Sequence, residues 1–192
     1  MKSTRESLIT LPNKHLREPS QKVGVITDEI KNIVQAMKET TLDWEDSREH
    51  EVGVALAAIQ IDRKLRIVVV RENMEDKTNR NFIVFINPEI TKFEGKVIED
   101  FEGCLSIKDI YGKVPRYSKV KVKALDINGK EFRVTAEDFL ARVFQHEIDH
   151  TKGIVFIDHI KDNPKAFYQL DKSGELKELD YENDIKSNNL LW

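Results

Sequence analysis

A periodic pattern of apolar positions near the start of the chain predicts its first helix. Thr27 can serve as the N-cap, and Asp28 and Glu29 follow in the first turn, where the helix dipole favours acidic side chains. The apolar residues that share one face of this helix are Ile26, Ile30, Ile33, Val34 and Met37. An amphipathic helix over residues 27–40 is therefore predicted to pack on an apolar surface.

Two runs of β-branched and aromatic residues, 65–71 and 81–88, predict strands joined by the polar loop 72–80. The Asn87-Pro88 pair is predicted to end the second strand. Further along, residues 119–134 alternate between apolar and polar side chains on both sides of Asn128-Gly129. This pattern predicts a β-hairpin with one buried face and one face that carries lysines.

A second helix is predicted after these strands. Thr135 can serve as its N-cap, Glu137 and Asp138 suit its first turn, and Gly153 is a suitable stop. The residues that follow one stripe of this helix are Phe139, Val143, His146 and His150. Two histidines thus extend an apolar stripe, with Glu147 at its border, and polar groups in such a place need partners.

The order of the elements favours an α+β fold, with antiparallel sheets packed around this second helix as its centre. The helix carries an HExxH motif at residues 146–150, through which we expect it to bind metal. At 192 residues, of which 40% are hydrophobic and 34% charged, the chain fits one domain over residues 1–192. From about residue 161 we expect a polar C-terminal extension with a turn at 172–174.

Charge and hydropathy set limits on the partners. The formal net charge of -3 gives no basic excess, so no direct nucleic-acid binding is predicted. No segment is apolar enough to span a membrane or to act as a secretory leader, so no membrane partner is predicted. Cys104 is the only cysteine, which rules out an intrachain disulfide and fits a reducing, cytoplasmic location.

His146, Glu147 and His150 form an HExxH motif. On a helix this motif supplies two imidazole ligands one turn apart and a carboxylate that can act on water at the metal. The alternative interpretation is two core histidines that hydrogen-bond to carbonyl groups. A catalytic metal also needs a third protein ligand and an open position.

Candidates for the third ligand differ in their support. The extended zincin pattern requires histidine at the position of Phe156, so that pattern does not fit. His159 lies beyond that position and is predicted to be a surface residue, while His15 and His50 are predicted to be solvated. Glu175 stays open as a ligand, although no helical stripe supports it.

Cys104 is the remaining candidate; a lone cysteine is more often a small buried apolar residue. Its surroundings nevertheless resemble the peptide deformylase family, which combines GxGLAAxQ, EGCLS and QHExDH segments. Here these segments read GVALAAIQ (53–60), EGCLS (102–106) and QHEIDH (145–150), in the family order. The resemblance covers most of the chain up to about Ile160.

The resemblance implies that Cys104, His146 and His150 hold one divalent metal ion, with water completing the site. Ligand type alone suggests zinc. The family implies Fe²⁺, replaceable by Zn²⁺, Ni²⁺ or Co²⁺. Glu147 would then act as the general base and return the proton to the leaving amine.

Further roles follow from the same resemblance. Gln60 and the backbone N–H of Leu105 would donate hydrogen bonds to the developing oxyanion. Glu102 and Arg116 would form a salt bridge that supports the cysteine loop, with a surface pair worth under about 1 kcal/mol as the alternative.

The implied reaction is hydrolysis of the formyl group from formyl-methionyl peptides or nascent chains, which releases formate. Val54, Gly103 and Val143 are our candidates for the apolar pocket that takes the methionine side chain. Ala55 replaces the second glycine of the family segment, and its methyl group is predicted to restrict the backbone. A transient ribosome encounter is also implied, although the mixed charge after Lys161 does not favour docking through a basic tail.

Two other functions stay open at this point. A metallopeptidase with a glutamate ligand would keep its metal and activity after Cys104→Ala. A protein that binds formyl peptides or metal without turnover would release no formate, and Ala55 is the sequence feature that favours it.

Overall fold

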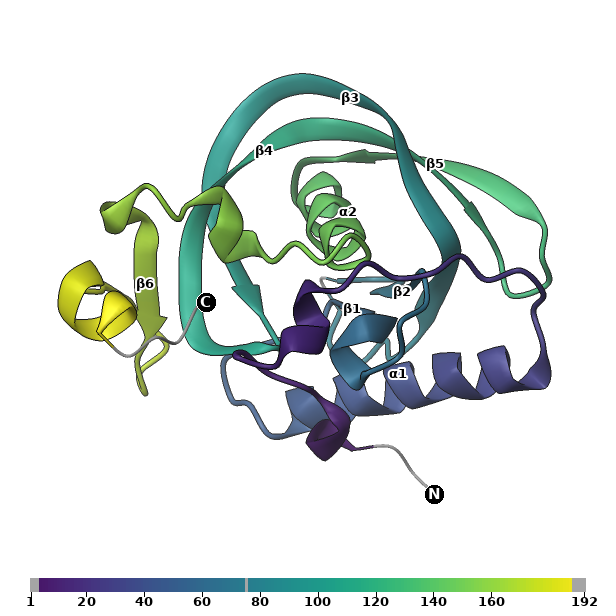
Figure 1. The fold of residues 1–192 in the computed structure, drawn as a ribbon, viewed down its shortest axis with the longest axis horizontal. Coiled ribbons are helices and arrows are strands. Elements are labelled where there is room, and N and C mark those ends of the chain that lie inside the picture. Colours follow the sequence, from purple (N-terminus) through teal and green to yellow (C-terminus); the bar gives the residue numbers. More distant parts are fainter. Residues whose placement is uncertain (1–3, 75, 188–192) are drawn as a thin grey trace.

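The computed structural model describes residues 4–74 and 76–187, and its strands form one antiparallel sheet. The main helices are α1 (Asp28–Asp46) and α2 (Asp138–His150). The strands are β1 (Ala55–Ala57), β2 (Ile67–Arg71), β3 (Phe82–Cys104), β4 (Ile107–Leu125), β5 (Glu131–Glu137), β6 (Phe167–Leu170) and β7 (Leu176–Glu178). Their order is β1-β2-β3-β4-β6-β7, with β5 paired to β4. The mixed helix and antiparallel-sheet class predicted from the sequence is confirmed. Figure 1 shows β3 and β4 as a long curved pair that arches over α2.

Helix α1 begins where the sequence predicts and extends further than predicted. The Thr27 hydroxyl accepts a hydrogen bond from the backbone N–H of Ile30 at 3.5 Å, as an N-cap should. The helix continues beyond Thr40 because Trp44 and Glu45 are also buried, which supplies tertiary contacts that the apolar pattern alone did not reveal.

Strand β2 is buried along its whole length, and its first four residues are apolar, because helices cover both of its faces. Val68 belongs to the same buried cluster as Phe144 of α2, whereas Val69 belongs to the same cluster as Met37 of α1. Successive side chains of a strand point to opposite faces, so neighbouring valines contact different helices. In Figure 1, α1 and α2 accordingly lie on opposite sides of β1 and β2.

The prediction that Asn87-Pro88 ends a strand is wrong. Strand β3 continues to Cys104, and its pairing with β4 shifts register between Ile86 and Glu89. Asn87 adopts a φ of 53° there, and its side chain bonds the backbone of Val23 in both directions, at 2.8 and 2.9 Å. A β-bulge leaves a residue unpaired, so Pro88 does not have to donate a backbone hydrogen bond to the neighbouring strand. The strand therefore bends at this point and does not end.

The hairpin predicted over residues 119–134 is confirmed as β4 and β5. Ala124 pairs with Phe132, and Gly129 adopts a φ of 81° in the turn. The prediction that Thr135 caps the following helix is wrong, because β5 stays paired with β4 as far as Glu137. Glu137 is therefore the residue before α2, and its side chain makes no capping hydrogen bond.

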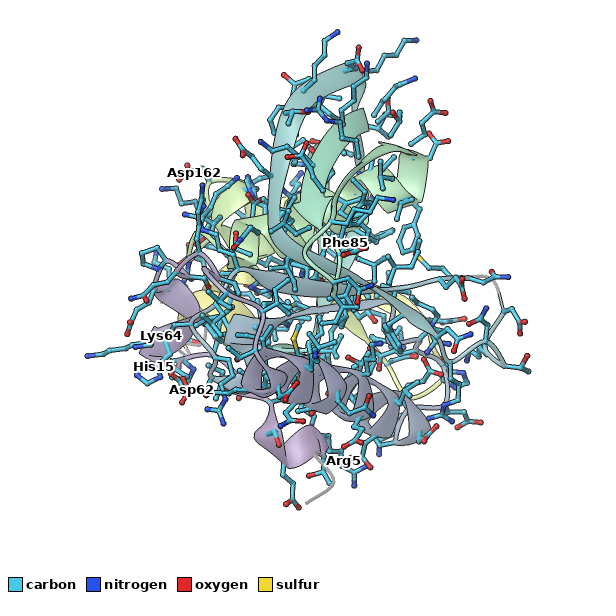
Figure 2. The ribbon with its side chains drawn as sticks, turned by 90° about the vertical axis from the view of Figure 1, so that its right-hand side faces the viewer. Arg5, His15, Asp62, Lys64, Phe85 and Asp162 are labelled. Carbon is cyan, nitrogen blue, oxygen red and sulfur yellow. The ribbon has the colours of Figure 1, made fainter. Side chains whose placement is uncertain are left out.

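Helix α2 packs its apolar side against the sheet. The rings of Phe144 and Phe85 meet edge to face with centroids 4.8 Å apart, and Figure 2 shows the labelled Phe85 inside the molecule. Phe139 departs from the predicted buried stripe, since it is 51% exposed at the start of the helix. The sheet covers the later turns of α2, so the buried stripe is continued by the histidines but not by Phe139.

Short segments complete the described chain. They are η1 (Arg5–Ser7), η2 (Lys14–Arg17), η3 (Ala58–Ile61), η4 (Phe156–His159), η5 (Pro164–Ala166) and the π-helical η6 (Tyr181–Lys186). After η5, β6 pairs with β4, and the turn predicted at 172–174 joins β6 to β7, with Gly174 at a φ of 83°. No helix within residues 4–74 and 76–187 has the length and hydropathy of a membrane span.

Candidate metal centre and active site

Three possible metal ligands from distant parts of the chain meet beside α2. Cys104 is the last residue of β3, and His146 and His150 lie one turn apart near the end of α2. One ligand atom from each residue lies within 4.8 Å of the other two. The Cys104 Sγ lies 3.3 Å from Nε2 of His150, and all three side chains are buried.

The donor set suits a divalent transition metal. A thiolate and two imidazoles are the nitrogen and sulfur ligands that such ions prefer, and three protein ligands leave one position open. Glu147 Oε2 and His150 Nδ1 are buried and lack a hydrogen-bond partner among the described residues. Since buried polar atoms are normally paired, these atoms indicate a site adapted to a ligand and not an ordinary core.

Glu147 belongs to α2, where it directly follows the candidate ligand His146. It is 5% exposed, and burial raises the pKa of its carboxyl from its usual value to about 7. A carboxylate with a pKa near neutrality can accept a proton and release it again at that pH.

Glu102 connects the strand that carries Cys104 to the helix that carries the histidines. Its Oε2 accepts from Nδ1 of His146 at 3.0 Å, and Arg116 donates to both carboxylate oxygens, at 2.8 and 3.1 Å. Burial alone would raise the pKa of Glu102, but hydrogen bonds from His146 and Arg116 outweigh it and lower that pKa to about 2. Both side chains of the Glu102–Arg116 pair are buried, so the alternative of a surface pair does not apply.

Three residues that the sequence did not suggest extend this network. Arg142 donates to Glu102 Oε1 at 2.9 Å and to the carbonyl of Val114 at 2.7 Å. Asp149 accepts from Arg116 at 2.6 Å and from Nε2 of His159 at 2.8 Å. An arginine one turn before His146, on a helix with an apolar stripe, was the available signal for Arg142.

The predicted oxyanion donors also lie at this site. Nε2 of Gln60 lies 3.5 Å from the Cys104 Sγ and 3.2 Å from the Ser106 hydroxyl, while its Oε1 accepts from the backbone of Ala57 at 2.9 Å. This second bond fixes the amide orientation, so the NH₂ group points toward the cysteine. Leu105 directly follows Cys104 and lines a cavity beside it.

A cavity of about 390 Å³ opens beside the candidate metal ligands. Its lining includes all three residues predicted for the methionine pocket, namely Val54, Gly103 and Val143. Lining residues that the sequence did not suggest are Trp44, Met74, Phe101 and Tyr111. Most of the cavity surface is therefore apolar, as a pocket for an unbranched apolar side chain requires.

Tyr111 is held in the wall of this cavity by a hydrogen bond. Its hydroxyl donates to Oε1 of Glu51 at 2.7 Å. Arg48 in turn contacts Glu51 at 3.3 Å and Asp109 at 2.7 Å, and thus ties the segment after α1 to the start of β4. Burial, followed by the hydrogen bond to Glu51, raises the pKa of Tyr111.

The remaining histidines are solvent-accessible, as predicted. His50 lines the cavity, although its side chain is still 43% exposed. His159 lies at the surface as predicted, and its side chain also contacts Asp149 at 2.8 Å. His15 bonds Asp62 at 2.6 Å on the outside of the molecule, where Figure 2 labels both with Lys64. Glu175 lies in the exposed β6–β7 turn and is not part of the cysteine–histidine group.

The expectation that Ala55 occupies a position needing positive φ is wrong, whereas its effect on the approach of substrate stays a prediction, because Ala55 also lines the cavity. Within the described chain, the four non-glycine residues with positive φ do not include it. Ala55 is 2% exposed and pairs with Val70, so its methyl group fills space in the core between β1 and α2.

Sequence comparisons place the chain among known proteins. The family model described as polypeptide deformylase matches residues 6–166. A peptide deformylase of Aquifex aeolicus is 42% identical over 154 residues, which cover 80% of this chain and 86% of the relative. A peptide deformylase of Thermomicrobium roseum is 38% identical over 175 residues, which cover 90% and 95%.

Solved structures agree with these sequence matches. A peptide deformylase from Legionella pneumophila superposes with a TM-score of 0.71 at 36% identity, covering 83% of this chain and 86% of that chain. A Synechococcus elongatus peptide deformylase, solved in complex with actinonin, superposes with a TM-score of 0.70 at 33% identity, covering 79% and 76%. The chain therefore belongs to the polypeptide deformylase family, whose members are metal-dependent hydrolases that remove formyl groups.

Proposed function

We propose that the protein hydrolyses the formyl group of formyl-methionyl peptides and nascent chains, with Cys104, His146 and His150 as the ligands of one divalent metal ion. The observation that carries this proposal is the buried convergence of the three ligand atoms within 4.8 Å. Fe²⁺ is the proposed ion, by likeness to the family, and Zn²⁺, Ni²⁺ and Co²⁺ suit the same ligands.

The proposed chemistry divides between the ion and the side chains around it. When bound, the ion supplies Lewis acidity and makes water a stronger nucleophile at neutral pH. Glu147 accepts a proton from the attacking water and passes it to the departing amine, so that formate and a free amino terminus result. Gln60 and the Leu105 N–H donate to the oxygen of the former formyl carbonyl as negative charge develops on it.

Substrate binding is proposed to use the cavity and its outer edge. The methionine side chain would occupy the apolar space between Val54, Gly103 and Val143, which line the cavity. Strand β1 lies at one end of the sheet order, so an extended peptide can pair with its open side. Glu102 and Arg116 would support the site by fixing the orientation of His146.

The test is formate release from formyl-Met-Ala-Ser by protein purified anaerobically with iron. Wild type is expected to release formate rapidly. Glu147→Ala should keep the metal and lower kcat by about 10²–10⁴-fold, the range for loss of a general base. Cys104→Ala should lose both metal and activity; an active, metal-loaded Cys104→Ala protein would instead favour a metallopeptidase with a different ligand.

A folded, metal-loaded wild type that releases no formate would overturn the proposal. Retained binding of the formyl peptide by such a protein would indicate a binding function without turnover.

The proposal extends to the organisation and location of the chain. We propose one deformylase-like domain over residues 1–192, with a polar extension from about 161; the family match over 6–166 and the pairing of β6 with β4 support it. A cytoplasmic location is proposed because a single cysteine fits a reducing compartment. The proposed ribosome encounter is transient, and no nucleic-acid or membrane partner is included.

A further inference from the structure

A buried ion pair lies behind the wall of the cavity and has no part in the chemistry proposed above. Glu45 belongs to the last turn of α1, and Arg71 is the last residue of β2. The Arg71 guanidinium donates to Oε2 of Glu45, and the two residues are 1% and 8% exposed, respectively. Burying two charges is costly, so the other contacts of this pair indicate what it contributes.

The pair binds both polar backbone groups of Gly53. The N–H of Gly53 donates to Oε2 of Glu45 at 2.9 Å, and its carbonyl accepts from Nε of Arg71 at 3.2 Å. The backbone N–H of Arg71 also donates to the carbonyl of Val54 at 2.8 Å. A Cβ atom at Gly53 would lie 2.6 Å from Cγ2 of Thr41, so residue 53 rests directly on α1. The segment that leads into β1 is therefore fixed from two sides.

The same guanidinium binds the connection between β2 and β3. Its Nη1 donates to the carbonyl of Asn79 at 3.2 Å and to that of Lys77 at 3.5 Å. Met74 belongs to this connection and lines the cavity, as does Val54 on the other segment. One buried cation thus sets the relative positions of two walls of the cavity.

We propose that Glu45 and Arg71 are positioning residues that hold Val54 and the open side of β1 where an extended formyl peptide binds. This inference rests on the proposed function. Neither side chain lines the cavity, so both act through the backbone of Gly53 and Val54. Loss of the pair should therefore weaken substrate binding and leave the metal ligands and Glu147 in place.

The chain offers a matched control for this pair. Arg80 and Asp46 form a second ion pair, 2.8 Å apart, between the same β2–β3 connection and the same end of α1. Their side chains are about half exposed, and their recorded hydrogen bond does not involve Gly53. Arg80→Lys thus makes a similar change nearby without disturbing the segment before β1.

The experiment compares Arg71→Lys, Glu45→Gln and Arg80→Lys for formate release from formyl-Met-Ala-Ser. Arg71→Lys keeps a charge opposite Glu45, but a lysine cannot reproduce the several fixed donor directions of the guanidinium. The first two variants are expected to raise KM about tenfold while kcat stays within about twofold, the pattern of lost uniform binding. Metal content should equal that of wild type, and Arg80→Lys should match wild type in all three quantities.

A direct binding measurement separates this inference from the proposed function. In a Glu147→Ala background, isothermal titration with formyl-Met-Ala-Ser should show Arg71→Lys weakening Kd by about the same tenfold factor. If wild type releases no formate, the proposed function fails, and this titration still tests the positioning role. If a single variant does not fold, the neutral pair Glu45→Gln with Arg71→Met removes both charges at similar volume.

Two results would overturn the positioning role. One is a folded Arg71→Lys or Glu45→Gln protein whose KM stays within twofold of wild type and whose Kd, measured in the Glu147→Ala background, stays within twofold of the Glu147→Ala protein. The other is a parallel loss of kcat and metal content, which would mean that the pair supports the fold of the whole site and not the binding of the peptide.

Discussion

Nδ1 of His146 lies 3.0 Å from Oε2 of Glu102, a residue that precedes Cys104 by two positions on β3. The carboxylate holds this ring nitrogen as the donor, which leaves the other nitrogen free to bind a metal ion. The same carboxylate binds Arg116 and Arg142, so one side chain relates the cysteine strand to the histidine helix.

Glu102→Gln should therefore destabilise the protein and weaken metal binding. The change removes the carboxylate partner of Arg142 and leaves Arg116 paired with Asp149 alone, and breaking a buried ion pair costs about 3–5 kcal/mol of unfolding free energy. Metal affinity should fall by about 10–100-fold, since the orientation of His146 is no longer fixed. Urea unfolding and metal competition with a chelator measure the two effects.

A matched control uses the exposed pair of Lys119 and Glu137, whose atoms lie 2.7 Å apart. Glu137→Gln should change the unfolding free energy by less than about 1 kcal/mol. Equal small effects of both substitutions would contradict the supporting role of Glu102.

Gly103→Ala should raise KM and lower stability. The new Cβ atom would lie 2.6 Å from Cε1 of Tyr111, whose hydroxyl is held by Glu51, so the ring cannot move without losing that bond. Overpacking of this kind costs about 1–3 kcal/mol. Gly24→Ala is the control, because nothing lies within 4 Å of its added methyl group. Peptide kinetics and thermal unfolding of both variants give the comparison, and an unchanged Gly103→Ala protein would exclude the proposed contact.

Tyr111 should make stability depend on pH in the alkaline range. Its pKa is raised in the folded protein, first by burial and then by the hydrogen bond to Glu51, so folding favours the neutral phenol. This contribution is complete below the ordinary tyrosine pKa of about 10 and is lost as the pH rises above it. The difference in unfolding free energy between wild type and Tyr111→Phe should therefore decrease above about pH 10. A difference in unfolding free energy that stays constant or grows above about pH 10 would contradict a raised pKa of Tyr111 in the folded protein.

Ala55→Gly should not improve the enzyme, although it restores the glycine of the family segment. The backbone of Ala55 needs no positive φ, and its methyl group is buried in the core. Glycine there should cost about 0.5–1 kcal/mol through added freedom of the unfolded chain. Urea unfolding tests the stability loss, and a marked rise in kcat/KM for the glycine variant would contradict this account.

The sequence predicted the site better than it predicted the path of the backbone. His146 and His150 could be selected because the HExxH spacing carries chemistry, whereas Cys104 was selected through the resemblance of its surroundings to the family; the structure brings the three together. Pro88 misled the strand prediction, since proline ends a strand only where a ladder N–H is required. The bulge beside it depends on Asn87 bonding Val23, a contact that no local pattern encodes.

Long-range contacts explain the other failures. Arg142, Asp149 and His159 gain their partners only when β3, β4 and η4 surround α2, so their place in the network could not be inferred from neighbours in sequence. Glu45 and Arg71 were also missed, because each alone resembles an ordinary charged residue at the end of an element. Their pairing becomes visible only in the folded chain.

The shortness of the terminal strands has a consequence for the protein in a crowded solution. β1 and β7, which occupy the two ends of the sheet order, contain three residues each. An exposed strand edge is a template on which other chains can polymerise, and the risk grows with the length of unpaired backbone. Three residues offer an incoming chain few backbone hydrogen bonds, and very short edge strands are one way in which proteins limit such pairing. At these two ends of the sheet order, the molecule can thus keep one edge available to a short peptide while offering its own copies little backbone to extend.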